Sequence, residues 1–163
     1  ITGSNGKTTV KEWLFQMLSP DYVVTRSPRS YNSQVGVPLS VWNLSAQTQV
    51  GIFEAGISEP GEMRRLAGIV RPTIGIFTSI GDAHQENFCS VEQKCMEKLE
   101  LFQTVDTLIY PAGNPIIDKC IRQFHVAGKL LPVEVDEAQP LEIDRQLCAA
   151  ACEVLGVPTA VIA

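Results

Sequence analysis

Apolar residues recur in this chain at two spacings, one typical of helices and the other of buried strands. The first helical repeat begins after Lys7 and ends at Ser19-Pro20, because proline cannot continue a helix. Its apolar positions are Val10, Trp13, Leu14, Met17 and Leu18. Their spacing of three or four residues predicts an amphipathic helix that starts directly after a glycine-rich loop.

Short apolar runs, rich in β-branched residues, alternate with further helical patterns. The runs cover residues 22–24, 50–53, 73–77 and 107–110, and the helical patterns cover 60–70, 90–102, 115–124 and 141–155. Runs of this kind are typical of parallel strands that are buried on both faces. Residues 126–140 could hold one or two more strands. The alternation predicts an α/β domain, a mostly parallel sheet flanked by helices.

Size and composition predict one domain over residues 1–163. A chain of 163 residues, 45% of them hydrophobic, is enough for one packed core. The sequence opens on Ile1-Thr2-Gly3, which resembles the end of a strand. We therefore expect the chain to be a piece of a longer protein.

Charge and cysteine content narrow the classes of function. The 13 basic and 18 acidic residues give a net charge of −5 without a long run of either sign, which argues against a nucleic-acid-binding protein. No apolar stretch reaches the roughly 18 residues of a membrane span. The five cysteines form no C-x-x-C pair, as expected of reduced thiols in the cytoplasm. We expect Cys148 and Cys152, one helical turn apart, to lie in the core rather than at a metal.

A glycine-rich turn that leads into a helix is the first candidate site. It comprises Gly3, Ser4, Asn5, Gly6, Lys7, Thr8 and Thr9. Glycines permit a tight turn, the backbone N–H groups and the helix N-terminus attract an anion, and a lysine can reach the outer phosphates of a nucleotide. The hydroxyl after the lysine is a ligand for Mg²⁺ in such loops, which here assigns Thr8. The spacing is shorter than that of the general phosphate loop, since Ile1 occupies the place of its first glycine.

Two further candidates directly follow apolar runs. Glu54 ends the run 50–53, and a carboxylate at the carboxyl end of a buried strand can hold Mg²⁺. The alternative is a solvated loop acid. His84 follows the run 73–77, beside Asp82, and in that setting we interpret it as a functional residue rather than an ordinary surface or core histidine. His125 lacks such a setting.

Several motifs together resemble the superfamily of Mur ligases and folylpolyglutamate synthases. They are TGSNGKTT at 2–9, EAG at 54–56, DAHQENFCSVE at 82–92 and EKLE at 97–100, in the order and spacing of that superfamily. The resemblance covers residues 1–102 and thins beyond them. Within the superfamily, NSQVGVPL at 32–39 and ISEPGEM at 57–63 are most similar to members that join D-alanyl-D-alanine to UDP-N-acetylmuramoyl-tripeptide.

The resemblance implies the roles of individual residues. Lys7 and its loop would bind the β- and γ-phosphates of ATP, with Thr8 and Glu54 on one Mg²⁺. His84 would serve a second Mg²⁺ together with Lys98, which is carbamylated in the family. A carbamate forms only from a neutral amine, so the site must lower the pKa of this lysine. An unmodified Lys98 would instead be a helix-surface charge near Glu100.

The resemblance also implies the reaction and the partners. ATP would phosphorylate the carboxylate of the UDP-linked peptide, and the amine of D-alanyl-D-alanine would then attack the acyl phosphate. Asn32 and Ser33 would line the substrate cleft, and Arg26 and Arg29 could meet the uridine diphosphate. The UDP-binding domain before residue 1 and the C-terminal domain after residue 163 would supply the other substrate contacts. We therefore expect this piece alone to fold without catalysing turnover.

Three alternatives remain open from the sequence. The first is another ligase of the superfamily, adding glutamate to folate or a different amino acid to the muramyl chain. The second is a plain phosphate-loop kinase or ATPase, which would need neither His84 nor a carbamylated Lys98. The third is a nucleotide-binding or assembly module without catalysis.

Overall fold

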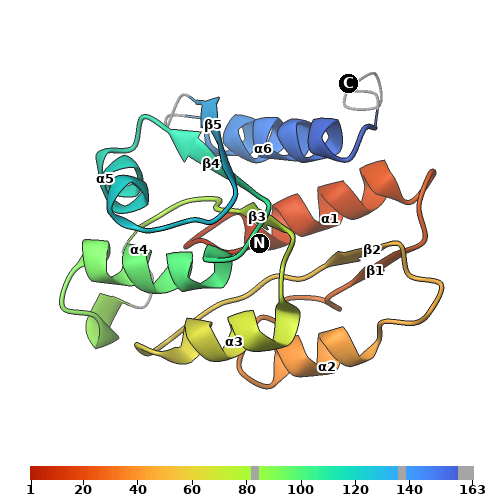
Figure 1. Ribbon diagram of the computed structural model, residues 1–163, viewed down its shortest axis with the longest axis horizontal. Helices are drawn as coiled ribbons and strands as arrows, with labels where there is room; N and C mark the ends of the chain where they lie inside the picture. Colours follow the sequence, from red (N-terminus) through yellow and green to blue (C-terminus); the bar gives the residue numbers. More distant parts are fainter. Residues whose placement is uncertain (82–84, 136–138, 158–163) are drawn as a thin grey trace.

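The computed structural model describes residues 1–81, 85–135 and 139–157, and shows parallel strands enclosed by helices (Figure 1). The strands are β1 Val24–Arg26, β2 Val50–Ile52, β3 Ile74–Ile76, β4 Thr107–Ala112 and β5 Lys129–Glu134. The α-helices are α1 Lys7–Leu18, α2 Gly36–Trp42, α3 Glu62–Val70, α4 Val91–Leu99, α5 Pro115–Gln123 and α6 Pro140–Val154. Short 3₁₀ turns lie at η1 Gln85–Asn87 and η2 Glu100–Phe102. The predicted α/β class is confirmed.

Every strand pair in the described residues is parallel. β1 pairs with β2, with Val24 opposite Val50, and the other sheet has the order β3-β4-β5, with Ile74 opposite Thr107. Parallel strands carry their carboxyl ends at one edge, and this is where a ligand meets an open α/β sheet. Glu54 follows β2 at this edge.

The segment that leads into the glycine loop connects the two sheets. On one side, the Ile1 amino group donates to the Phe53 carbonyl and the Ala55 N–H donates to the Ile1 carbonyl, both at 2.8 Å. On the other side, Thr2 forms a parallel bridge with Phe77. The loop at residues 3–9 therefore emerges between β2 and β3, flanked by the residues that follow both strands.

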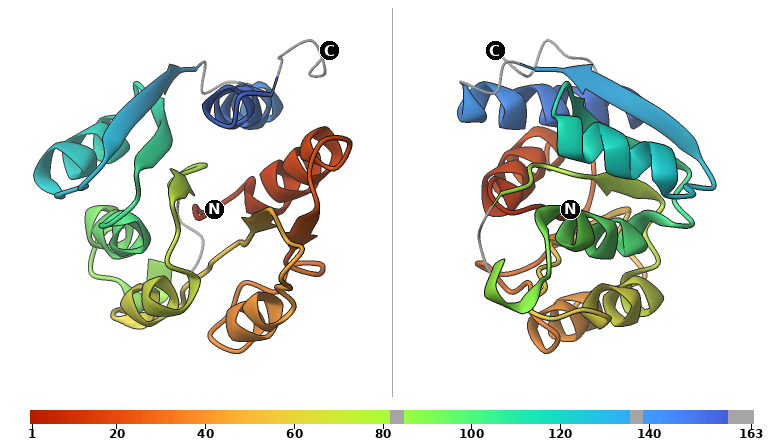
Figure 2. Two further views of the ribbon diagram at one scale, coloured as in Figure 1. Left: turned by 45° about the vertical axis from the view of Figure 1, so that its right-hand side comes forward. Right: turned by 90° about the vertical axis from the view of Figure 1, so that its left-hand side faces the viewer.

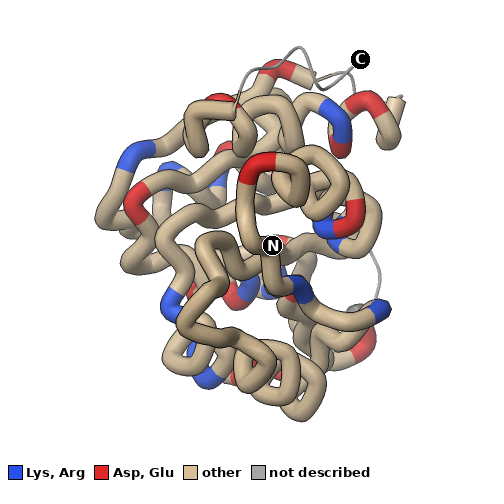
Figure 3. Tube along the Cα trace, turned by 90° about the vertical axis from the view of Figure 1, so that its right-hand side faces the viewer, with Lys and Arg blue, Asp and Glu red and all other residues tan. Residues whose placement is uncertain are grey.

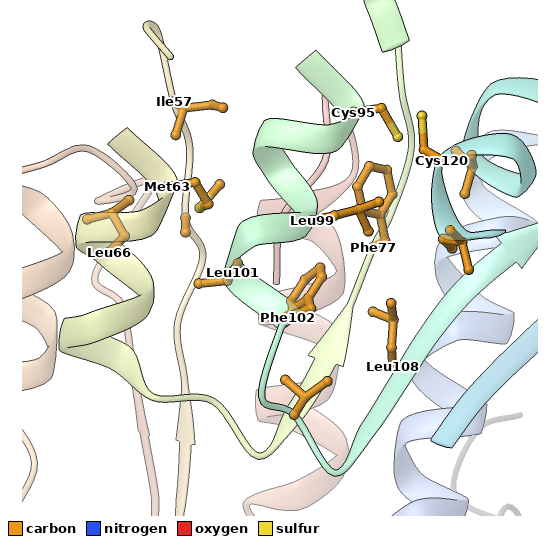
Figure 4. Packing of buried hydrophobic residues seen from close by; sticks show 14 of the residues in the cluster. Ile57, Met63, Leu66, Phe77, Cys95, Leu99, Leu101, Phe102, Leu108 and Cys120 are labelled. Atoms are coloured by element: carbon orange, nitrogen blue, oxygen red, sulfur yellow. The ribbon is translucent and has the colours of Figure 1, made fainter. Parts of the chain in front are cut away.

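Helices cover both faces of the strands (Figure 2). On one face α1 and α6 pack on the strands through a cluster that includes Val10, Leu14 and Cys148. On the other face a cluster centred on Phe77 and Phe102 joins α3, α4 and α5 (Figure 4). β3 and β4 are mostly buried, and burial on both faces is the reason that these two strands are almost continuously apolar. β1 and β5 are more exposed.

The cysteines behave as small apolar residues. Cys148 and Cys152 are fully buried between α6 and α1, as predicted, and Cys95 and Cys120 are buried between α4 and α5. Cys89 is exposed, and all five thiols are free. Burial raises the pKa of Cys148 to about 12, so this thiol stays protonated and inert at neutral pH.

The elements differ from the sequence prediction in three places. The predicted strand 22–24 lies at Val24–Arg26, and the helix expected over 90–102 passes from α4 into a 3₁₀ turn after Leu99. Helix α2 was not predicted, because it is short and contains a proline, and because several of its apolar residues face solvent. Leu39 is 56% exposed and Trp42 87% exposed, so the pattern lacks one apolar stripe.

Charged residues of both signs are spread over the chain trace (Figure 3). Among the residues that the structure describes, no helix is long and apolar enough to cross a bilayer.

Candidate functional site

The two loop glycines are required by close neighbours as well as by backbone conformation. Gly6 has φ 83°, and a Cβ there would lie 2.4 Å from Asp144 Oδ1. A Cβ on Gly3 would lie 2.0 Å from Thr78 Oγ1. Only glycine fits both positions, which confirms the tight turn inferred from the sequence.

The loop is braced by the residues that follow β3. Ser4 N–H donates to the Ser79 carbonyl and Asn5 N–H donates to the Ser79 hydroxyl, both at 2.9 Å. The Ser4 hydroxyl in turn accepts from Gly81 N–H at 3.0 Å. These contacts join the loop to the segment just before Asp82 and His84, although these two residues themselves lie outside the described residues.

The start of α1 is suited to an anion. Its first turn contains no acidic residue, and the backbone N–H groups of Lys7, Thr8 and Thr9 have no partner within the helix. The Lys7 ammonium donates to the carbonyls of Gly3 and Ser4, at 2.9 and 3.0 Å. Burial lowers the pKa of Lys7, and the charge of Glu54 partly offsets this effect. A cation and several N–H donors therefore converge on one small loop.

Glu54 is buried behind this loop, so the interpretation as a solvated loop acid is wrong. Its side chain is 0% exposed, and Thr8 Oγ1 donates to its Oε2 at 2.8 Å. Its Oε1 has no hydrogen-bond partner among the described residues. An orphaned carboxylate oxygen beside a hydroxyl oxygen is the kind of donor set that Mg²⁺ takes. Thr8 and Glu54 thus fit the metal that the sequence assigned to them, although the described residues contain no group of three or more His, Cys, Asp or Glu side chains placed to hold a metal.

Lys98 approaches the loop from α4 and is not a surface charge. It is only 4% exposed, and its Nζ donates to the Gly3 carbonyl at 3.1 Å. Burial, with smaller contributions from the positive charges of Lys7 and Lys94, lowers its pKa from 10.5 to about 7. A pKa this low makes the uncharged amine, the form that reacts with CO₂, accessible near neutral pH. Glu100 does not pair with it but lies 3.7 Å from Arg64.

A pocket of about 290 Å³ brings these groups together with the predicted substrate residues. Its lining includes Gly3, Ser4, Lys7, Asn32, Ser33, Gln34, Gly56, Glu62 and Lys98. Asn32 is held there by its carbonyl, which accepts from Gly56 N–H at 2.7 Å. Ser33 is held by its hydroxyl, which accepts from Gly36 N–H at 3.1 Å at the start of α2. Residues up to 95 positions apart in sequence thus face one cavity, whose wall includes residues of the glycine loop together with the predicted cleft residues Asn32 and Ser33.

The two arginines that could meet the uridine diphosphate are not among the residues that line this pocket. Arg26 lies 3.6 Å above the centre of the Phe15 ring and 3.0 Å from Glu12 Oε2. Arg29 is exposed and has φ 48°, an uncommon conformation for a residue other than glycine. His125 is also exposed, as its setting suggested.

Three buried polar residues of the site were missed by sequence reasoning. Lys11 and Lys94 are 0% and 1% exposed, and Asp144 is 7% exposed against the Gly6 turn. Burial raises the pKa of Asp144. The sequence did contain an indication that Lys11 belongs to the site, since it lies one helical turn after Lys7, next to the apolar face of α1.

A glycine loop at a helix start, backed by a buried carboxylate and a buried lysine on a parallel sheet, defines a phosphate-loop α/β domain. The chain belongs to the Mur ligase family, because residues 1–140 match the Mur ligase middle domain.

Two similar proteins have the same name. The chain is 43% identical over 102 residues to the UDP-N-acetylmuramoyl-tripeptide--D-alanyl-D-alanine ligase of Treponema pallidum, a match of 63% of this chain and 22% of that protein. It is 40% identical over 122 residues to the enzyme of the same name from Borreliella burgdorferi, covering 74% of this chain and 26% of that protein. The chain thus spans about a quarter of the length of these relatives.

Solved structures share the fold. MurF from Acinetobacter baumannii matches 99% of this chain, and 43% of its own length, with a TM-score of 0.84 at 21% identity. MurF ligase from Thermotoga maritima in complex with ADP matches 97% of this chain, and 45% of its own, with a TM-score of 0.82 at 21% identity.

Proposed function

We propose that this chain is the ATP-binding part of a ligase that joins D-alanyl-D-alanine to UDP-N-acetylmuramoyl-tripeptide, a step of peptidoglycan precursor synthesis in the cytoplasm. The observation that carries the proposal is the single pocket that Lys7, Lys98, Asn32 and Ser33 share. A phosphate-binding loop and a substrate cleft that share a wall are what transfer of a phosphoryl group to a bound carboxylate needs. The names of the relatives support the choice of substrates.

The charges of the site suit this chemistry. Transfer from ATP to a carboxylate brings two anions together, so positive groups must offset their repulsion. Lys7 and the N-terminus of α1 supply a cation and N–H donors on the phosphate side. Thr8 and Glu54 would hold Mg²⁺, which supplies charge neutralisation and orientation of the phosphates when bound. The acyl phosphate formed in this way is attacked by the amine of the dipeptide, and phosphate leaves.

In the same proposal Lys98 is carbamylated and serves a second Mg²⁺ with His84. The lowered pKa and the burial of Lys98 support the modification, because only the neutral amine reacts with CO₂. Carbon-13 NMR of the parent protein under ¹³CO₂ should show a carbamate signal that is absent from Lys98→Ala. A spectrum unchanged by that substitution would exclude this part of the proposal.

The decisive measurement is phosphate release by the intact parent protein with ATP and Mg²⁺. We expect release to require both UDP-N-acetylmuramoyl-tripeptide and D-alanyl-D-alanine. Release that ignores both substrates would leave a plain ATPase, and nucleotide binding without any release would favour a non-catalytic module.

Related ligases are separated by exchanging substrates in the same assay. Glutamate or another amino acid replaces the dipeptide, and folate replaces the UDP-linked peptide. Activity restricted to another pair would reassign the protein within its family. We also propose that the domains outside residues 1–163 supply the remaining substrate contacts, so that this piece alone does not turn over; ligation by the isolated chain would contradict this.

A further inference from the structure

Lys11 is a buried cation that none of the roles above uses. Its side chain is 0% exposed, and a buried ammonium is costly unless it is paired and hydrogen-bonded. Its Nζ donates to the Arg29 carbonyl, and it lies 3.2 Å from Glu12 Oε1 and 4.0 Å from Glu54 Oε1. The ammonium therefore stands between the metal-binding carboxylate and the loop of residues 27–32.

The 27–32 loop contacts the nucleotide side of the site at several points. The Ser27 hydroxyl accepts from the backbone N–H of Glu54 at 3.3 Å, and the Ser30 hydroxyl lies 3.3 Å from Thr8 Oγ1. Between these contacts Arg29 adopts φ 48°, which a non-glycine residue keeps only where its surroundings hold it. The hydrogen bond from Lys11 to the Arg29 carbonyl is such a restraint.

The same loop ends at the substrate pocket. Asn32 lines the pocket, and its carbonyl accepts from Gly56 N–H, two residues beyond Glu54. Ser33 follows directly and also lines the pocket, whereas Lys11 is not among the lining residues. An effect of Lys11 on the substrate must therefore be transmitted by the groups that it contacts, the 27–32 loop and Glu54.

We propose that Lys11 is a positioning residue that clamps the 27–32 loop to Glu54, and thereby sets Asn32 and Ser33 for the peptide-bearing substrate. The inference rests on the proposed function, because it assigns that pocket wall to the UDP-linked peptide. A methionine has a similar length but no charge, so Lys11→Met removes the clamp and retains most of the packing.

The kinetic test uses the intact parent enzyme. We expect Lys11→Met to raise the KM for UDP-N-acetylmuramoyl-tripeptide about tenfold with kcat changed by less than about threefold, the pattern of lost substrate binding. The KM for Mg-ATP should rise by a smaller factor, because Lys11 also lies 4.0 Å from Glu54 Oε1. Equal changes in all three constants, or no change, would overturn the proposal.

Hydrogen exchange tests whether Lys11 holds the 27–32 loop, and it does not require enzyme turnover. Gly56 N–H donates to the loop carbonyl of Asn32, whereas the neighbouring Ala55 N–H donates to the Ile1 carbonyl. In the parent protein labelled with ¹⁵N at glycine and alanine, we expect Lys11→Met to accelerate hydrogen exchange of Gly56 about tenfold relative to Ala55. An unchanged ratio of the two rates would show that Lys11 does not hold the loop.

Leu14→Ala is the matched control for general destabilisation. Leu14 is buried on the same helix but packs in the core cluster beneath α6. This substitution should lower the melting temperature without changing the Gly56 to Ala55 ratio or the KM pattern; if it reproduces the effects of Lys11→Met, the role of Lys11 is only structural. If wild-type enzyme shows no substrate-dependent phosphate release, the proposed function fails, and the exchange ratio still decides whether Lys11 clamps the loop.

Discussion

At the scale of single residues, the site is built from charges that have been taken out of water. Lys98, Lys11 and Glu54 are each less than 5% exposed, although such side chains are seldom buried without partners. Lys98 and Glu54 are hydrogen-bonded to the glycine loop, and Lys11 lies 4.0 Å from Glu54. Burying these charges costs stability, and the buried charges lie where the proposed chemistry needs them.

Lys98 should make stability depend on pH. Its pKa is about 7 in the folded chain and 10.5 in the unfolded one, so the cost of its burial is complete below pH 7 and disappears as the pH rises to 10.5. The Lys98 contribution to the free energy of unfolding should therefore increase by up to about 1.4 kcal/mol per pH unit in this window. Urea unfolding without CO₂ should show that Lys98→Met stabilises the chain more at about pH 7 than at about pH 9.

Lys129→Met is the control for this measurement, since Lys129 is exposed on β5. A stabilisation by Lys98→Met that is equal at both pH values would mean that the buried amine does not titrate as described.

Glu54→Gln should weaken binding of Mg-ADP more than binding of metal-free ADP. The substitution keeps the shape of the side chain but removes the negative charge that Mg²⁺ requires, and we expect a loss of about tenfold, or about 1.4 kcal/mol. Calorimetric titration with and without a chelator measures the two affinities. Glu62→Gln serves as the control, because Glu62 lines the same pocket but its carboxylate accepts from the N–H groups of Ser58 and Glu59. Equal weakening of both nucleotide forms would remove Glu54 from the metal site.

At the scale of elements, α1 and α6 are in close contact at the Gly6 turn. Gly6→Ala meets two obstacles, a left-handed backbone and Asp144. Gly61, at the start of α3, has nearly the same φ, 82°, and a methyl group added there would have nothing within 4 Å. Gly61→Ala should cost about 1 kcal/mol for backbone conformation alone, and Gly6→Ala clearly more. Thermal unfolding of both variants separates the two contributions.

The double substitution Gly6→Ala/Asp144→Ala removes the clash and should recover most of that difference. If Gly6→Ala costs no more than Gly61→Ala, the contact between the loop and α6 is not as close as the structure indicates.

Local patterns predicted the elements well where one face of an element is apolar. The helix after the glycine loop and the carboxylate that ends the run 50–53 were both recognised in this way. Lys98 was different, because its role came only from the resemblance; its hydrogen bond to Gly3 spans 95 positions of sequence, and no periodicity reports such a contact. Lys11 was missed because a lysine at a helical position is usually solvated, and the carbonyl and carboxylates that pair with it here are visible only in three dimensions.

At the scale of the whole molecule, one domain presents only part of the proposed reaction. The pocket wall contains residues of the glycine loop and the residues that we propose for the substrate cleft. The chain spans about a quarter of the length of the two relatives named above. We therefore expect the isolated chain to bind nucleotide without hydrolysing it.

Mg-ADP at about one hundred times its Kd should stabilise the folded chain by about 2.7 kcal/mol. The measurement is chemical unfolding with and without the nucleotide. Lys7→Met should largely remove this stabilisation, and an equal gain in wild type and variant would show that the nucleotide binds elsewhere.

Because the cysteines differ in burial, a fluorescent dye can be attached to the chain at a single cysteine. Burial raises the pKa values of Cys95, Cys120, Cys148 and Cys152, whereas Cys89 is exposed five residues after His84. A maleimide dye should therefore react first at Cys89, without any engineered substitution. Its fluorescence would then report, in real time, whether the segment between β3 and α4 responds when nucleotide and metal are added.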